Sequence, residues 1–231
     1  MDVHILSGGA AQGVVKALQA QFLAETGAGL QATFGAVGIM KEKLLAGAPC
    51  DVLILTQALI DELEAAGHVA PGSAAPMGRV KTGVAVKAGE AQPDVATPEG
   101  LRAALLAAKG IYFPDPQKAT AGIHFINVVK KLGILDDVQH ALRPFPNGAT
   151  AMAQMAKDNE PGLIGCTQVT EILYTEGVTL VAPLPVEFEL ATLYTAAVAS
   201  RAAEPALAQK LVDALSGSAS RALREQGGFE L

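Results

Sequence analysis

The chain has 231 residues, of which 17 are basic and 23 acidic, giving a formal net charge of −6. Hydrophobic residues make up 50% of it, while 24 glycines and 13 prolines are too few for a low-complexity chain. The negative charge and the lack of a basic cluster exclude nucleic acid as a partner, because phosphate binding needs concentrated Lys and Arg.

The sequence also limits location and cofactors. No run is apolar enough over about 20 residues to span a membrane, so the protein is not membrane-embedded. No signal peptide is recognised, which predicts a cytoplasmic protein as written, or a periplasmic one if a leader has been removed. The two cysteines, Cys50 and Cys166, show no metal-ligand spacing, so neither a metal nor another cofactor is expected.

Short apolar strands alternate with amphipathic helices along the first third of the chain, which is typical of a parallel three-layer α/β sheet. The predicted strands are Val3–Leu6, Leu30–Phe34 and Asp51–Leu55, and the helices that follow them are Gln12–Glu25, Ile39–Ala46 and Ala58–Ala66.

A turn-rich stretch at residues 67–79 separates this part from the rest. Later strands are predicted at Val80–Val86, Ile111–Phe113, Leu163–Gly165, Thr179–Val181 and Leu190–Ser200. Later helices are predicted at Thr97–Lys109, Ile123–Leu132, Leu135–Leu142, Ala149–Lys157, Val169–Tyr174, Pro205–Leu215 and Ala219–Gln226.

Four loops of small residues join a strand to a helix: Ser7-Gly8-Gly9-Ala10, Gly35-Ala36-Val37-Gly38, Ala119-Thr120-Ala121-Gly122 and Pro146-Asn147-Gly148-Ala149-Thr150. Glycine lets a ligand approach the backbone, and a helix N-terminus offers unpaired N–H groups with partial positive charge. The loops are therefore either anion sites or ordinary caps and turns. None of them matches a phosphate-loop or dinucleotide-binding fingerprint.

Two basic side chains near the third loop are candidate ligand contacts. Lys118 is the one basic residue of its loop and could pair with a carboxylate, or be a solvated loop lysine. His124, at the start of the following helix, could donate to a bound anion or move a proton, or be a surface histidine.

Three further residues lie around the start of the helix at Val169–Tyr174. Gln168 and Glu171 either face a ligand or cap the helix. Cys166 is either a reactive thiolate or a buried, inert thiol. If the protein is an enzyme, the candidates for acid–base chemistry are His124, Glu171 and Cys166.

Three segments in the first quarter of the chain form a recognisable set: VHILSGGAAQGVVKALQAQFLAETG, GAVG and LLAGAPCDVLILT. In this order they resemble the molybdate-type solute-binding proteins of ABC importers. The resemblance continues through FPDPQKATAGIH, PNGATAMAQM, the Gly162–Val169 stretch and a closing GGF, so it covers nearly the whole chain.

This resemblance implies a two-lobed type II periplasmic-binding-protein fold with a ligand cleft between the lobes. Lobe 1 would combine residues 1–80 and 195–231, and lobe 2 would be residues 81–194, with crossover strands near Val80–Val86 and Leu190–Ser200. The implied ligand is a small anion. The expected contacts are Ser7, Gly8, Gly9, Ala36, Val37, Lys118, Ala121, Gly122, His124, Gly148, Ala149, Thr150 and Gln168.

The sequence departs from the family at two positions. A serine of the family's second loop falls on Val37, and a tyrosine that closes the family's pocket falls on Gly165. Each lost hydrogen bond to a charged group costs roughly 1.5–3 kcal/mol, which disfavours a bare tetrahedral oxyanion. Replacing tyrosine by glycine is also expected to enlarge the pocket, which favours an organic carboxylate over molybdate.

Three functions remain open from the sequence. The first is a binding protein that closes two lobes around a small anion, with an ABC permease as partner if the chain is exported. The second is an isomerase of an unsaturated carboxylic acid such as aconitate on the same scaffold. The third is a cytoplasmic ligand sensor that partners a regulator.

Overall fold

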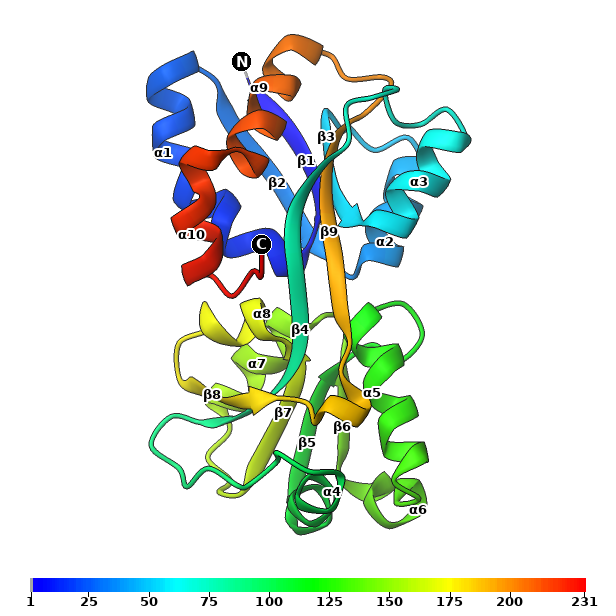
Figure 1. Ribbon diagram of the computed structural model, residues 1–231, viewed down its shortest axis with the longest axis vertical. Coiled ribbons are helices and arrows are strands. Elements are labelled where there is room, and N and C mark those ends of the chain that lie inside the picture. Colours follow the sequence, from blue (N-terminus) through cyan, green and yellow to red (C-terminus); the bar gives the residue numbers. More distant parts are fainter. Residues whose placement is uncertain (1) are drawn as a thin grey trace. The chain divides into compact units, whose positions relative to one another are not determined.

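The structure is a computed structural model, and it describes residues 2–231. Two compact units are present. The first combines the chain up to Val80 with Thr192–Leu231, and the second is Lys81–Ala191. The chain leaves the first unit within β4 (Ala75–Lys87) and returns at the start of β9 (Ala191–Val198) (Figure 1).

The sheet of the first unit is built from β1 (Asp2–Gly8), β2 (Gly29–Gly35), β3 (Val52–Thr56) and β9. Its order is β2-β1-β3-β9, with β9 antiparallel to its neighbour β3 and the others parallel. The helices of this unit are α1 (Gln12–Thr26), α2 (Val37–Leu45), α3 (Gln57–Ala65), α9 (Pro205–Ser216) and α10 (Arg221–Gln226), with 3-10 turns η1 (Gly9–Ala11) and η4 (Ser218–Ser220).

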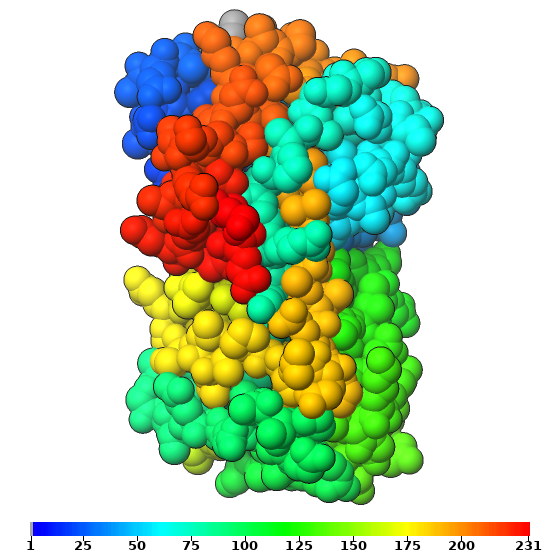
Figure 2. Space-filling model, viewed as in Figure 1, coloured from blue at the N-terminus to red at the C-terminus, as the bar shows by residue number. Residues whose placement is uncertain are grey.

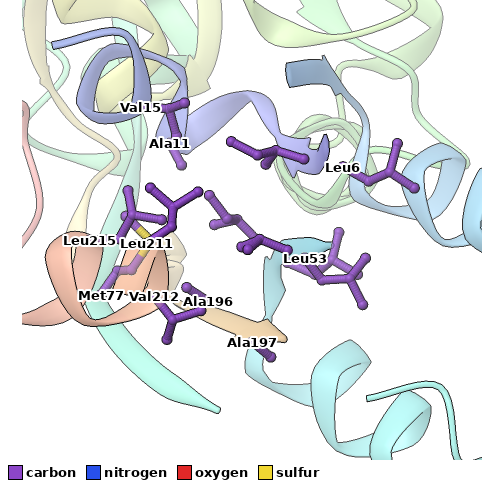
Figure 3. Close-up of a cluster of buried hydrophobic side chains, with 14 of the residues drawn as sticks. Leu6, Ala11, Val15, Leu53, Met77, Ala196, Ala197, Leu211, Val212 and Leu215 are labelled. Atoms are coloured by element: carbon purple, nitrogen blue, oxygen red, sulfur yellow. The ribbon is translucent and has the colours of Figure 1, made fainter. Parts of the chain in front are cut away.

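The core of the first unit includes side chains from its sheet, from β4 and from α9. Figure 3 shows Met77 of β4 beside Leu211 and Leu215 of α9, whereas Leu6 of β1 and Leu53 of β3 lie apart from these three. All five side chains are buried. Because burying one such side chain contributes roughly 1.5–3 kcal/mol, this cluster holds segments together that are distant in sequence.

The C-terminal segment closes over the start of β4. In the space-filling view the red end of the chain lies directly against the teal strand (Figure 2). The buried guanidinium of Arg224 donates to the carbonyl oxygens of Met77, Ser216 and Gly217. The backbone N–H of Arg79 also donates to the carbonyl of Glu230 at 2.8 Å, so the chain end is joined to β4 by backbone pairing.

The sheet of the second unit has the order β4-β7-β5-β6, with β8 (Val178–Pro183) pairing with β4. β5 (Gly110–Pro114), β6 (Leu142–Phe145) and β7 (Leu163–Gln168) are mutually parallel, and β4 is antiparallel to β7. The helices of this unit are α4 (Pro98–Ala107), α5 (Thr120–Lys131), α6 (Leu135–Val138), α7 (Gly148–Lys157) and α8 (Val169–Leu173), with 3-10 turns η2 (Gln139–Ala141) and η3 (Val186–Phe188).

One predicted helix is wrong. The segment Leu135–Leu142 forms only the short α6 and the turn η2, after which Leu142 begins the strand β6. Leu142 lies opposite Ile111 in the ladder with β5, so tertiary pairing overrides the local helical pattern. Pro144 is tolerated within β6 because this strand is at the edge of the sheet.

Candidate functional site

The first loop begins at the end of β1, where Ser7 and Gly8 are closely packed against other residues. Ser7 is fully buried, and its hydroxyl donates to the carbonyl oxygen of Gly8 at 2.8 Å. A methyl group on Gly8 would lie 2.8 Å from Cγ1 of Val37 and 3.2 Å from Cε1 of Tyr194. The structure therefore brings the first and second predicted loops together, and Gly8 is needed for that approach.

The start of α2 presents backbone donors without any side chain to accept from them. Its N-cap residue is Ala36, whose side chain has no hydrogen-bond acceptor, and the first turn holds no acidic residue. By contrast, the next helix of the same unit, α3, is capped by Thr56, whose hydroxyl accepts from the N–H of Leu59. The N–H groups at Ala36 and Val37 thus lack a side-chain acceptor, which is what an anion site at this loop would require.

In the second unit, the start of α5 also presents backbone N–H groups without a side-chain acceptor. Its N-cap is Ala119, with no side-chain cap and no acid in the first turn. A methyl on Gly122 would lie 2.2 Å from the carbonyl oxygen of Asp115, so only glycine lets the helix begin against the end of β5. The preceding turn is formed by Asp115, whose carboxylate accepts from the N–H groups of Gln117 and Lys118. Lys118 itself is exposed.

His124 is half-buried on α5, and its Nε2 lies 2.7 Å from the carbonyl oxygen of Phe188 in η3. Because a carbonyl only accepts, Nε2 carries the proton and donates it. The histidine is therefore engaged with the segment that leads into β9, and Nδ1 is the ring nitrogen left for other chemistry.

The start of α7 is the fourth predicted loop, and we call residues Asn147–Thr150 the α7 seat. The side chain of Asn147 accepts from the N–H of Thr150 at 2.8 Å. A methyl on Gly148 would lie only 1.9 Å from Oε2 of Glu171 and from Oγ1 of Thr167. The glycine is thus required because a carboxyl group of the protein itself fills the seat.

Glu171 is almost fully buried, with 4% of its surface exposed. Its carboxyl group accepts from the hydroxyl of Thr167 at 2.5 Å and from the backbone N–H groups of Gln168 and Ala149. Burial raises the pKa of Glu171 to about 7, against the lowering effect of these three donors. Since Gln168 is the N-cap of α8 and Glu171 lies three residues later, the pair also forms part of a capping box.

Cys166 lies on β7 and is fully buried in the apolar core of the second unit. Burial raises the pKa of its thiol well above the ordinary value. The group is therefore a protonated thiol at neutral pH, which favours the inert interpretation over the thiolate.

The expected enlargement of the pocket at Gly165 is wrong. A methyl at this position would lie 2.5 Å from Cε of Met152 and 3.1 Å from Cε of Met155, both buried on α7. Long, flexible methionine side chains fill the volume that a larger residue would take. Gly165 therefore allows α7 to pack closely on β7 and leaves no added space for a ligand.

Sequence reasoning missed several polar residues near the end of β7. Thr82 on β4 lies opposite Gln168 in the ladder with β7, and Thr170 follows two residues later. Both threonines are buried, and their hydroxyls have no hydrogen-bond partner among residues 2–231. Threonine in a strand is too common to single out, but a Thr-Gln-Val-Thr-Glu run at a helix start is a usable signal.

Within residues 2–231, no group of three or more His, Cys, Asp or Glu side chains is placed to hold a metal ion. No helix among these residues is both long and apolar enough to cross a bilayer.

Comparison with known proteins gives a family match over nearly the whole chain. The family described as bacterial extracellular solute-binding protein matches residues 3–230. A curated relative, an aconitate isomerase from a Pseudomonas species, is 24% identical over 229 residues, which cover 96% of this chain and 86% of that protein.

Solved structures share the fold at low identity. The periplasmic molybdate-binding protein of Azotobacter vinelandii matches with a TM-score of 0.81 and 21% identity, over 99% of each chain. PEB3 with bound L-phospholactate matches with a TM-score of 0.70 and 15% identity, over 100% of each chain. The predicted type II periplasmic-binding-protein fold is confirmed, as is the resemblance to the solute-binding family.

Proposed function

Because the chain belongs to the bacterial extracellular solute-binding proteins, we propose that it binds a small anion, an organic carboxylate rather than molybdate, and closes its two units on that ligand. If the chain is exported, its partner in this proposal is an ABC permease. The proposal needs no cofactor.

One observation carries the anion-binding proposal. α2 in the first unit and α5 in the second both start without a side-chain cap and without an acidic residue in the first turn. Each start therefore offers unpaired N–H groups with a partial positive charge of about half a unit. These are neutral donors, so they bind an anion without a buried counter-charge.

The lack of two hydroxyl donors around the start of α2 supports a carboxylate ligand over a tetrahedral oxyanion. Val37 offers no hydroxyl at the start of α2, and the hydroxyl proton of Ser7 is already given to Gly8. A tetrahedral dianion would lack two donors there, at a cost of roughly 1.5–3 kcal/mol each.

The experiment is a thermal-shift panel with molybdate, tungstate, sulfate and phosphate beside di- and tricarboxylates. A ligand at a hundred times its dissociation constant stabilises the protein by about 2.7 kcal/mol. For a chain of this size each kcal/mol raises the melting midpoint by about 2–4 °C. The proposal expects a carboxylate to give the largest rise, and a larger rise with molybdate or tungstate would contradict it.

A pair of matched variants tests the role of the helix start. Gly38→Asp puts a carboxylate at the second position of α2, where it repels an anion yet suits the helix dipole. Ala58→Asp makes the same change at the second position of α3, whose start is already capped by Thr56. We expect the first variant to abolish the ligand-induced shift and the second to retain it.

A second candidate function is isomerisation of an unsaturated carboxylic acid by an allylic proton shift. Two observations favour it: the similarity to the Pseudomonas aconitate isomerase, and a carboxyl group, Glu171, with a pKa of about 7. Such a pKa suits a group that takes and returns a proton at neutral pH. Incubating the protein with cis- or trans-aconitate in D₂O and recording proton NMR spectra tests it, because turnover would give the other isomer, while unchanged spectra would exclude this reaction.

A further inference from the structure

A cavity of about 450 Å³ lies between the start of β4, β9 and the C-terminal segment, and we call it the β4 cavity. Its volume is within the range of pockets that hold small molecules. All of its lining residues belong to the first unit, and none of them comes from the four small-residue loops. The residues of its wall that carry the argument are Pro76, Arg79, Leu193, Arg224, Glu230 and Leu231.

Glycine at position 78 allows the C-terminal segment to approach β4 and so to form this cavity. Its φ is +139°, a conformation that other residues rarely adopt. A Cβ there would also lie 2.6 Å from Cδ2 of Leu231 and 2.9 Å from the carbonyl oxygen of Glu230. Beside it, the backbones of Arg79 and Glu230 pair in both directions at 2.8 Å. This pairing fixes the backbone from which both side chains reach the cavity.

Arg224 is a buried cation in the wall of the β4 cavity, with only 5% of its surface exposed. Its guanidinium donates to the carbonyl oxygens of Met77, Ser216 and Gly217. These bonds use at most three of its five N–H groups, and Nε–H has no acceptor among residues 2–231. The hydrogen-bonding capacity of the group is therefore only partly used.

The positive charge of Arg224 also lacks a counter-ion. Among residues 2–231 no carboxylate forms an ion pair with it, because its charged neighbours on α10, Arg221 and Glu225, pair with each other at 3.1 Å. Carbonyl oxygens satisfy N–H groups but do not cancel a charge. Burial lowers the pKa of Arg224, which is the expected effect of holding a cation away from water. A negatively charged ligand in the cavity would supply the missing counter-charge.

The rest of the wall indicates the class of anion. Beside the buried guanidinium, Arg79 adds a second positive charge and Glu230 adds one negative charge. The charged side chains therefore leave a single positive charge in excess, which suits a ligand with a single negative charge. Pro76, Leu193 and Leu231 give the wall an apolar part, against which a hydrocarbon tail can be buried.

We propose that the first unit has a second binding site in the β4 cavity, which takes an organic monocarboxylate with an apolar tail. The carboxylate is held beside Arg224 and Arg79, and the tail packs against the apolar part of the wall. This site goes beyond the proposed function, because it shares no residue with the helix start of α2 and takes a ligand of different shape and charge.

The test is isothermal titration calorimetry of the whole chain with hexanoate, hexanamide and acetate as probes. Hexanamide has the tail without the charge, and acetate has the charge without the tail. We expect hexanoate to bind at least about tenfold more tightly than either. The titrations are repeated in Gly38→Asp, which blocks the start of α2, and hexanoate binding should persist there.

Three charge variants assign the binding to the β4 cavity. Arg79→Gln should weaken hexanoate binding by about three- to tenfold, and Glu230→Gln should tighten it by a similar factor, because each changes the charge beside the ligand by one unit. Both side chains belong to exposed residues, so neither change disturbs the core. Lys210→Gln makes the same charge change as Arg79→Gln at an exposed position of α9 outside the cavity, and it should alter the affinity by less than about twofold.

Arg224→Met removes the buried charge itself and should abolish hexanoate binding. Because it also removes three bonds to backbone carbonyls, the pair of variants at positions 79 and 230 decides the question if this one fails to fold. Equal affinities for hexanoate and hexanamide would overturn the proposal, as would unchanged affinities in both Arg79→Gln and Glu230→Gln. The proposal also fails if hexanoate does not bind, or if its binding is lost in Gly38→Asp.

Discussion

The two units place similar loops at the ends of their strands but use the backbone donors differently. In the first unit, α2 starts with an alanine cap and an apolar first residue, so its N–H groups have no side-chain acceptor. In the second unit, α7 starts with a glycine against the carboxyl group of Glu171 and with Asn147 as a cap. The comparison teaches that the backbone donors of a small-residue loop before a helix stay available only if no side chain of the same unit accepts from them.

The largest effect is expected from adding one methyl group to each loop. In Gly148→Ala the new carbon meets oxygen atoms of Glu171 and Thr167 at 1.9 Å, so the buried carboxyl must move; we expect a loss of about 3 kcal/mol or more in unfolding free energy. In Gly8→Ala it meets Val37 and Tyr194 at 2.8 and 3.2 Å, and a loss of about 1–2 kcal/mol is expected. Urea denaturation measures both, and equal losses would break the comparison.

The next effect is a pH dependence of stability that arises in the second unit. The pKa of Glu171 is raised from 4.5 to about 7, so the folded protein holds this proton more tightly than the unfolded chain does. The unfolding free energy should be highest below about pH 4.5 and should fall by on the order of 3 kcal/mol as the pH rises through 7. In Glu171→Gln this fall should disappear from denaturation curves recorded across the range, whereas a parallel fall in the variant would assign it to other groups.

The third prediction concerns a buried carboxylate of the first unit, Asp51, and compares it with an exposed one. Asp51 is 2% exposed and accepts from the N–H groups of His4 and Ala203, each at 2.7 Å, so it joins β1 to the segment after β9. Asp51→Asn replaces a charged acceptor by a weaker one, and we expect a loss of about 2 kcal/mol in urea denaturation. The exposed Asp61→Asn should cost less than about 0.5 kcal/mol. Similar losses in both variants would show that burial of Asp51 is not the cause.

The smallest effect concerns the helix caps. The N–H of Thr150 lies 2.8 Å from Oδ1 of Asn147 in the second unit, and that of Leu59 lies 3.4 Å from Oγ1 of Thr56 in the first. Asn147→Ala should therefore lower the unfolding free energy by about 1 kcal/mol, and Thr56→Ala by about 0.5 kcal/mol. Thermal unfolding of both variants checks the order, which would be contradicted by a greater loss in Thr56→Ala.

Much of the fold can be predicted from the sequence, because local patterns of apolar and polar residues determine most of its strands and helices. Alternating apolar strands and amphipathic helices predict the βα units of the first unit, which the structure contains. The strand at Leu142–Phe145 could not be predicted in this way, because its stability comes from pairing with β5, about 30 residues earlier in the chain.

The candidate site was harder to predict, because the orientation of side chains depends on packing. The loops around Ala36 and Gly122 are identifiable from their small residues, and the helix starts there are indeed uncapped. The sequence does not reveal that Met152 and Met155 fill the space beside Gly165, or that Glu171 reaches back to the start of α7. These contacts join residues ten or more positions apart in the sequence and depend on the final packing of β7 against α7.

The return of the chain through β9 has a consequence for folding on the ribosome. Lys81–Ala191 is a continuous segment and can fold as it emerges, whereas the first unit lacks β9 until Thr192–Val198 has been synthesised. Until then one edge of β3, whose residues Val52–Leu55 are fully buried in the finished protein, has no partner strand. A nascent chain paused near Ala191 thus exposes an apolar strand edge that is prone to aggregation, and we expect it to depend on chaperones at that stage.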